Sequence, residues 1–101
     1  MTTSFQDKIY EALKKVPKGK VTTYQELAHA IGSRAYRAVG SAMRKNPFAP
    51  KVPCQRVINA DGSIGNFSGK DGIKGKIKML RKEGITITNN KIDLKKYKFK
   101  F

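Results

Sequence analysis

The feature that most constrains the fold is a pair of short helical patterns separated by a tight glycine turn. Thr23 followed three residues later by Glu26 forms a capping box that opens the first pattern, and Gly32 is expected to end it at the C′ position. The second pattern resumes at Ala35 and ends before Asn46. Two short helices joined in this way predict a helix-turn-helix, whose second helix is commonly the one offered to DNA, although structural helix bundles contain the same turn.

The second of these helices combines small residues with cations. Its small residues are Ala38, Gly40, Ser41 and Ala42, and its cations are Arg37, Arg44 and Lys45. Small side chains would let the helix backbone approach a partner closely, and the cations would suit phosphates. The same small residues could instead serve close packing against another helix inside the domain. The sequence leaves these two interpretations open.

Two further helices are expected, one at each side of this pair. The first covers about residues 4–15 and begins with a capping box of Ser4 and Asp7. The last covers about residues 72–83 and ends at Gly84 as its C-cap. Its expected apolar face holds Ile73, Ile77 and Leu80, and its cations, which could simply face solvent, are Lys74, Lys76, Lys78, Arg81 and Lys82.

The remaining segments predict a small amount of β structure. Residues 56–59 suggest a short strand, followed by a turn at 60–63 and a glycine-bounded loop at 64–69 with a polar centre. Residues 85–94 alternate in the period-two manner of a hairpin, with Asn89 and Asn90 at its turn. The expected fold class is therefore mainly α with a small β element.

Length and charge set the broad class. The chain has 101 residues, the size of one domain, and its 22 Lys and Arg against 7 Asp and Glu give a formal net charge of +15. Such a charge favours nucleic acid or an anionic membrane surface as partner, although the lysine-rich tail 95–101 could reflect composition alone. The N-terminus resembles no signal peptide and no long apolar run occurs, so we expect an intracellular, cytoplasmic protein.

The chain has a single cysteine, Cys54. It cannot form an intramolecular disulfide, and no Cys/His cluster offers ligands for zinc, so we expect no metal site. Three prolines at positions 47, 50 and 53 predict a stiff, extended loop that delivers Cys54 to a fixed place. A lone cysteine often only fills a buried apolar gap, but one thiol in a cationic chain also suggests sulfur chemistry on a polyanion.

Four blocks of the sequence, taken together, resemble one known family. They are Thr23–Ala28, Arg37–Pro47, Pro53–Val57 and Gly62–Gly69. In this order and spacing the chain is similar, from about Phe5 to Gly84, to the O6-alkylguanine-DNA alkyltransferases, which move an alkyl group from damaged guanine to their own cysteine. Larger members carry an additional N-terminal domain. The chain resembles their C-terminal DNA-binding and active-site domain on its own, a winged helix-turn-helix of the three-helical-bundle type, with the basic tail added.

The resemblance implies a role for individual residues. Cys54 would be the alkyl acceptor, Tyr24 the hydroxyl that assists the departing guanine, and Arg37 the side chain that replaces the extruded base in the minor groove. Asn46 would brace the active-site loop, and the backbone of Cys54 and Val57 would bind the guanine edge. The residues expected at DNA or lesion are Arg37, Ala38, Gly40, Ser41, Arg44, Asn46, Arg56, Val57 and Ser68. The partner would be double-stranded DNA containing O6-alkylguanine, bound by a monomer without a cofactor.

Gln55 departs from the family pattern, which usually has histidine there to draw the thiol proton through a water, held by a glutamate that matches Glu83. Glutamine cannot accept that proton. A thiol of ordinary pKa near 8.5 is only about 3% thiolate at pH 7, so transfer should be slow unless Arg56 or Lys51 favours the anion. This opens two alternatives: an alkyltransferase-like protein that binds the lesion without efficient transfer and flags it for other repair, and a plain basic DNA-binding module.

Overall fold

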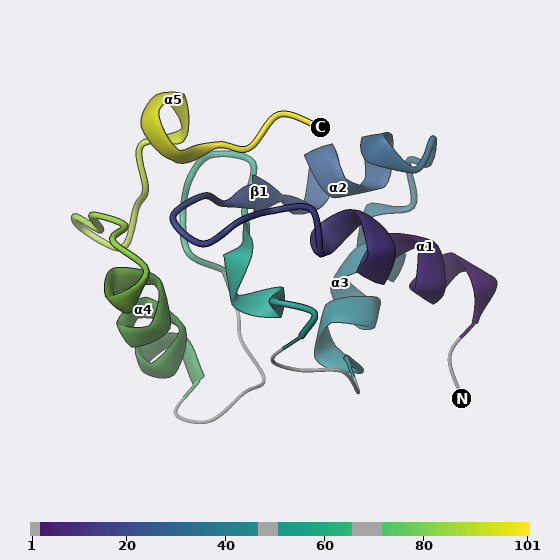
Figure 1. Ribbon diagram of the computed structural model, residues 1–101, viewed down its shortest axis with the longest axis horizontal. Coiled ribbons are helices and arrows are strands. Elements are labelled where there is room, and N and C mark those ends of the chain that lie inside the picture. The colour runs from purple at the N-terminus through teal and green to yellow at the C-terminus, as the bar shows by residue number, and fades with distance from the viewer. Residues whose placement is uncertain (1–2, 47–50, 66–71) are drawn as a thin grey trace.

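The computed structural model in Figure 1 is mainly helical and describes residues 3–46, 51–65 and 72–101. In chain order its elements are α1 (Ser4–Leu13), β1 (Thr22–Thr23), α2 (Tyr24–Ala30), α3 (Tyr36–Arg44), the 3-10 turn η1 (Cys54–Arg56), β2 (Val57–Ile58), α4 (Gly72–Lys82) and α5 (Leu94–Tyr97). This arrangement confirms the expected fold class, with few and short strands beside several helices. No helix of the described residues is long and apolar enough to cross a membrane.

The N-cap of the first helix lies one residue earlier than the sequence suggested. Thr3, not Ser4, is the N-cap: its hydroxyl accepts from the Gln6 backbone N–H at 3.1 Å, and the Gln6 side chain accepts from the Thr3 N–H at 3.0 Å. Glutamine at the third helical position is long enough to reach back to the cap, which the shorter Asp7 is not. The expected box of Ser4 and Asp7 was therefore wrong, whereas the helix itself is confirmed.

The predicted helix-turn-helix is present in α2 and α3. Thr23 caps α2 by accepting from the Glu26 backbone N–H at 3.0 Å, and Gly32 follows the helix at φ +72°, where a side chain would be strained. Helices α1, α2 and α3 pack against one another around a fully buried core. Its largest members include Ile9, Leu13, Val16, Leu27, Val39, Val52 and Val57.

A two-stranded parallel sheet joins this bundle to the rest of the chain. Thr22 pairs with Val57 and Thr23 with Ile58. The strand expected at residues 56–59 is thus shorter, because Arg56 belongs to η1. The partner strand was missed, since two threonines before a helix give no alternating pattern. The sheet fixes the start of α2 against the end of η1.

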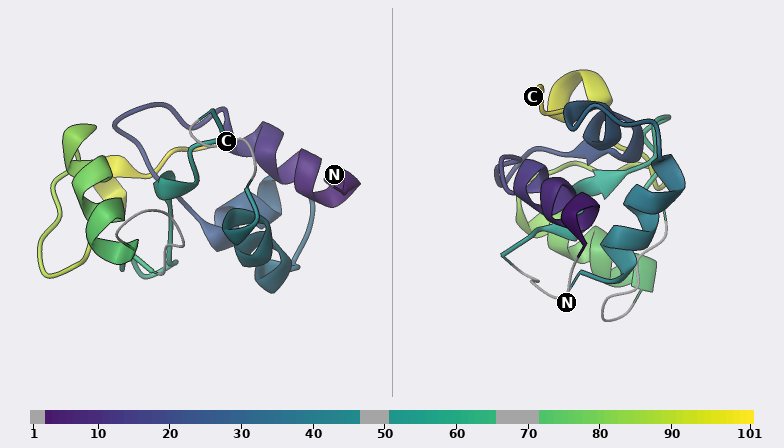
Figure 2. Two further views of the ribbon diagram at one scale, coloured as in Figure 1. Left: turned by 90° about the horizontal axis from the view of Figure 1, so that it is seen from below. Right: turned by 90° about the vertical axis from the view of Figure 1, so that its right-hand side faces the viewer.

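The C-terminal segment is part of the fold rather than a charged appendage. Val21 donates to the Tyr97 carbonyl at 2.9 Å and accepts from the Phe99 N–H at 2.8 Å, and Figures 1 and 2 show this segment running beside β1. Tyr97 is buried in a second core cluster with Ile58 and Leu80. The tail 95–101 therefore contributes Tyr97 and Phe99 to the packed interior and is not only a run of surface cations.

The predicted hairpin at residues 85–94 is present only at its turn. Asn89 and Asn90 have φ of 53° and 59°, and Thr88 and Lys91 exchange both backbone hydrogen bonds. Two consecutive positive φ angles define the tight turn that hairpins prefer. Beyond that pair the strands separate, because Ile85, Ile87 and Ile92 pack into the second core.

Helix α4 packs Ile77 and Leu80 into the core, as expected, but differs from the expectation at Ile73 and Lys76. Ile73 is 43% exposed, whereas Lys76 is completely buried together with Leu80. Lys76 and Leu80 lie four residues apart and so share one face of the helix, while Ile73 lies in its first turn, beyond the core. The assignment of Ile73 to the apolar face and of Lys76 to the cationic one was wrong.

Candidate active site and DNA-facing surface

Cys54 occupies the first position of η1 and is only partly buried. It packs against the edge of the bundle core, so it does not fill a closed gap in the interior. Its N–H donates to the Val52 carbonyl at 2.9 Å, and the same carbonyl accepts from the Asn46 side-chain amide at 2.7 Å. The end of α3 is thereby tied to the segment two residues before the thiol.

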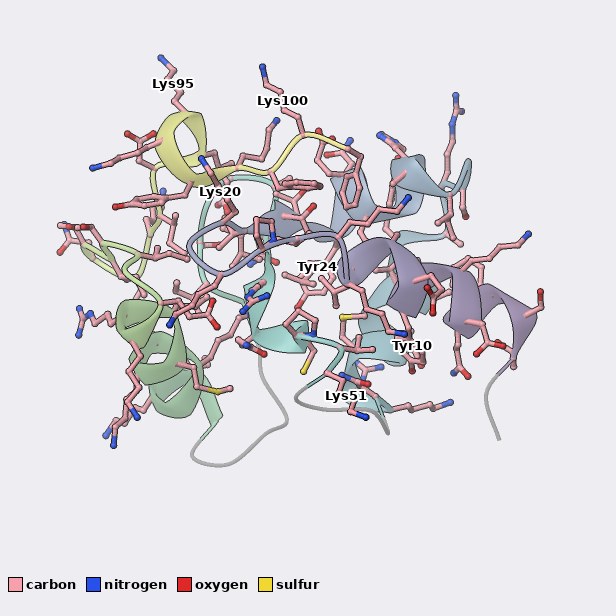
Figure 3. The ribbon with its side chains drawn as sticks, viewed as in Figure 1. Tyr10, Lys20, Tyr24, Lys51, Lys95 and Lys100 are labelled. Atoms are coloured by element: carbon pink, nitrogen blue, oxygen red, sulfur yellow. The ribbon has the colours of Figure 1, made fainter. Side chains whose placement is uncertain are left out.

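Tyr24, the first residue of α2, is half-buried and packs against the same core cluster as Cys54. Burial raises the pKa of its phenol, and the charge of an ionised Cys54 raises it further, against a smaller lowering by Arg44. Tyr24 therefore remains a protonated hydroxyl at neutral pH and can donate a hydrogen bond. Figure 3 shows it towards the middle of the molecule, whereas Lys51 is exposed at its edge.

A second tyrosine, which the sequence did not single out, stands near the thiol. The Tyr10 hydroxyl of α1 donates to the Ala42 carbonyl of α3 at 2.8 Å inside the core (Figure 3). Burial, the carboxylate of Asp7 and the charge of an ionised Cys54 all raise its pKa. Tyr10 thus holds the first and third helices together beside the site. Its place on the apolar stripe of α1 was the signal available in the sequence.

Gln55 and Arg56 both bind Glu83 at the end of α4. The Gln55 amide Nε2 donates to Glu83 Oε2 at 3.1 Å. The Arg56 guanidinium donates to both carboxylate oxygens, at 2.8 and 3.0 Å, and to the Val16 carbonyl at 2.9 Å. Gln55 therefore occupies a place in which a side chain can be held by Glu83. The charge of Arg56 is paired inside the protein, which leaves little of it to act on the Cys54 thiol.

The small residues of α3 were expected either to pack inside the domain or to face a partner, and each interpretation applies to one face of the helix. Ala42 is fully buried and serves the core, but Arg37, Ala38 and Arg44 are exposed. At Gly40 a Cβ would meet no described atom within 4 Å, so packing inside the domain does not require glycine there. The outer face of α3, formed by Arg37, Ala38, Gly40, Ser41 and Arg44, thus presents small side chains between cations.

One residue of the site was missed altogether. Lys76 of α4 is 0% exposed, and its Nζ donates to the Val57 carbonyl at 2.6 Å. Burial lowers its pKa to about 8, and the charge of an ionised Cys54 opposes this shift. The spacing of Lys76 from Leu80 was the available signal, but a lysine is rarely expected inside.

Among the expected residues, Ser68 and the prolines at 47 and 50 lie outside the residues that the structure describes.

No group of three His, Cys, Asp or Glu side chains able to hold a metal occurs in residues 3–46, 51–65 and 72–101. The charge of an ionised Cys54 acts instead on two tyrosine hydroxyls and a buried lysine, and the residue after Cys54 is an amide bound to a carboxylate. Of these groups, Tyr24 can donate a hydrogen bond and Lys76 adds a positive charge.

The fold and this site define a class of small helix-turn-helix domains with a cysteine at the edge of the bundle. Residues 4–85 match the family described as "6-O-methylguanine DNA methyltransferase, DNA binding domain". The chain belongs to this family.

Relatives of two kinds are similar to the chain. A methylated-DNA–protein-cysteine methyltransferase of Methanosarcina barkeri is 49% identical over 68% of the chain, and a bifunctional methyltransferase/endonuclease of Picrophilus torridus is 46% identical over 90% of it. The chain spans only 45% and 30% of the lengths of these two proteins.

Two solved structures have the same fold. S. pombe Atl1, in complex with damaged DNA containing O6-carboxymethylguanine, matches with a TM-score of 0.87 and 33% identity over the whole of both chains. Mycobacterium tuberculosis OGT, in complex with DNA, matches with a TM-score of 0.78 and 41% identity, over 83% of this chain and 51% of that one.

Proposed function

We propose that the protein repairs duplex DNA by moving an alkyl group from O6-alkylguanine to Cys54, once per molecule. The observation that carries this proposal is a free, partly exposed thiol at the start of η1, within the stretch that matches the family. The Cys54 sulfur attacks the alkyl carbon, the carbon–oxygen bond to guanine breaks, and a thioether forms. The thiol proton passes through solvent to the departing guanine, so the base is restored and the protein is consumed.

The surrounding residues suit this reaction. Tyr24 keeps its proton at neutral pH and can donate to guanine as it leaves. Asn46 holds the segment before the thiol through the Val52 carbonyl. The outer face of α3 would enter the minor groove, with Arg37 filling the space of the extruded base, because a stacked guanine cannot reach a thiol. The chain would correspond to the C-terminal, DNA-binding and active-site domain of larger family members, acting on DNA inside the cell.

The direct test is single-turnover transfer. The protein is mixed with a slight excess of duplex carrying one O6-methylguanine, digested, and the Cys54 peptide is weighed by mass spectrometry. We expect a gain of one methyl group with the lesion duplex and none with an unmodified duplex. Cys54→Ala serves as the matched control and should retain affinity for duplex DNA within a few-fold, since the cationic surface performs the binding. Methyl transfer to another residue in that variant would overturn the assignment.

The second candidate is recognition of the lesion without efficient transfer. Two observations favour it: the match to S. pombe Atl1 over the whole of both chains, and an amide at position 55 where a base would activate the thiol. In this case the protein would bind O6-alkylguanine duplex more tightly than unmodified duplex in a gel-shift titration, while the Cys54 peptide keeps its mass. Equal affinity for both duplexes, without transfer, would leave only a basic DNA-binding module.

A further inference from the structure

A shallow groove on the outer side of α4 is lined mainly by cations. Its volume is about 570 Å³, and its lining residues are Lys74, Ile77, Lys78, Arg81 and Lys82. Because Lys74, Lys78 and Arg81 follow one another at intervals of four and three residues, they form one stripe along the helix. The stripe lies opposite the buried face of α4, which holds Lys76 and Leu80. From first to last the four cations span about 12 Å of helix axis.

Neighbouring carboxylates do not neutralise the positive charge of this groove. No aspartate or glutamate occurs from Gly72 to Lys82, and Glu83, which follows, is already bound by two side chains of η1. The ion pairs found among the described residues include none of the four groove cations. Arg81 donates to the Ile87 carbonyl at 3.2 Å, which holds its guanidinium without opposing its charge. Since like charges one turn apart repel, this face favours an anionic partner.

The chemistry of the face suits a phosphate backbone better than a membrane. A helix that lies on a bilayer inserts large apolar side chains beside its cations. In α4, Ile77 and Leu80 pack into the second core cluster, and Ile73 is the one large apolar side chain of the helix that is exposed. Cations without such anchors suit contacts with phosphates, which need no base to be read. Duplex DNA offers phosphates at close and regular spacing along its whole length.

The groove lies on a different side of the molecule from the outer face of α3. Helix α4 packs against η1, whereas α3 packs against α1 and α2. Figure 1 and the left view of Figure 2 show α4 at one end of the molecule, with η1 and β2 between it and α3. The cations of α4 therefore belong to a surface separate from the one that carries Arg37 and Arg44.

We propose that the cationic groove of α4 binds the phosphate backbone of a second segment of duplex DNA while α3 holds the first. The contact is electrostatic and depends on the release of counterions, so it requires no lesion and no particular sequence. Two linked contacts keep the protein close to DNA when one of them opens, which lets it pass directly between neighbouring segments. The inference goes beyond the proposed function and rests on it only in that α3 binds the first duplex.

A capture experiment tests whether one protein holds two duplexes. A biotinylated duplex with one O6-methylguanine is fixed to beads, loaded with less than one protein per duplex, and washed. A fluorescent duplex without a lesion is then added, and beads without protein give the background. We expect the wild type to retain the fluorescent duplex at about 50 mM salt and to release most of it by about 200 mM, because a few phosphate contacts carry the binding.

A triple variant removes the charge of the groove. Glutamine replaces Lys74, Lys78 and Lys82, which are exposed, and glutamine suits a helix about as well as lysine. Retention of the fluorescent duplex should fall about tenfold or more, and the salt slope of its binding should become shallower by about 2.7 for three lost phosphate contacts. Arginine at the same three positions keeps the charge and should keep retention. Retention that survives the glutamine substitutions would overturn the proposal.

A matched control removes the same charge elsewhere. Glutamine replaces Lys8, Lys15 and Lys18, three exposed lysines in or just after α1. These positions are distant from α4 in Figure 1, and charges separated by more than about 10 Å are largely screened at 0.1 M salt. Retention should therefore stay within about threefold of the wild type. Equal losses in the two triple variants would show that only the net charge of the protein matters, and the groove would have no role.

Two alternative occupants give different results. If the α4 variant binds the lesion duplex itself more weakly and the wild type retains no second duplex, the groove contacts the flank of the first duplex and the proposal is wrong. Vesicles of phosphatidylcholine and phosphatidylserine, added at the same total charge as unlabelled duplex, should displace the fluorescent duplex less than that DNA does. Stronger displacement by vesicles would assign the groove to a membrane and contradict the proposal.

Transfer from free O6-benzylguanine, measured on the wild type, keeps the two proposals distinguishable. If the wild type transfers nothing but its retention of the second duplex depends on the lysines of α4, the transferase function fails and the second DNA surface stands. If the wild type transfers the benzyl group but retains no second duplex, the second surface fails and the transferase function stands.

Discussion

Replacing the buried Lys76 should change how the stability of the protein depends on pH. Burial lowers the pKa of this lysine from 10.5 to about 8 in the folded protein, whereas the unfolded chain keeps the ordinary value. Between these two values the unfolded state binds the extra proton, so the free energy of unfolding rises with pH through this window. At 1.36 kcal/mol for each pKa unit, the rise amounts to about 3 kcal/mol.

The variant Lys76→Met lacks this contribution but leaves the Val57 carbonyl without its donor, which costs about 1–3 kcal/mol. At pH 7 the two effects oppose each other, and the variant should be about as stable as the wild type or up to about 2 kcal/mol more stable. Above pH 10 only the lost hydrogen bond remains, and the variant should be the less stable protein by about 1–3 kcal/mol. The order of stability should therefore reverse with pH.

Urea unfolding followed by circular dichroism at pH 7, 8, 9 and 10 measures the effect. Only the difference between variant and wild type is interpreted, because the other lysines titrate in both. Lys78→Met controls for the loss of an exposed lysine, and the same comparison in a Cys54→Ala background removes the charge of an ionised Cys54, which acts on Lys76. A difference that stays constant from pH 7 to 10 would show that Lys76 is not held in a poorly hydrated place.

Three further outcomes are expected. Gln55→His should raise single-turnover transfer at pH 7 by about tenfold to a hundredfold, since Glu83 already binds the side chain at this position, and an unchanged rate would mean that the thiol needs no base. Arg37→Ala should slow repair of duplex DNA far more than transfer to free O6-benzylguanine, whereas equal losses would make it a structural residue. The logarithm of DNA affinity should fall with the logarithm of salt at a slope of about −4.5 for roughly five neutralised phosphates, and a flat dependence would exclude DNA as the main partner.

Local signals made the helix-turn-helix predictable. The cap at Thr23 and the positive φ at Gly32 depend on residues within one or two turns of the chain. The residue types at these two positions therefore predict where the helix begins and ends. The pairing of Thr22 with Val57 joins residues far apart in the sequence and leaves no local pattern. The strand β1 was missed for that reason, although Tyr24, which directly follows it, was identified.

The sequence identified the site residues whose side chains are chemically distinctive. It did not identify the residue whose position depends on how α4 packs. Cys54 stood out by residue type, whereas Gln55 and the other site residues followed from the family resemblance. Lys76 did not, because Ile73, Ile77 and Leu80 gave a plausible apolar stripe and a lysine is ordinarily assigned to solvent. Only the packing of α4 against η1 shows that the stripe is rotated towards Lys76.

The pairing of Val21 with Lys98 has a consequence for the order in which the protein folds. Val21 directly precedes β1, and its backbone partners, Tyr97 and Phe99, lie far away along the sequence. The bundle of α1, α2 and α3 can collapse early from local contacts, but β1, which leads directly into Tyr24 of α2, gains this outer neighbour only when a very long loop closes. A chain that has folded without this late contact would therefore have a formed bundle and a loosely held start of α2.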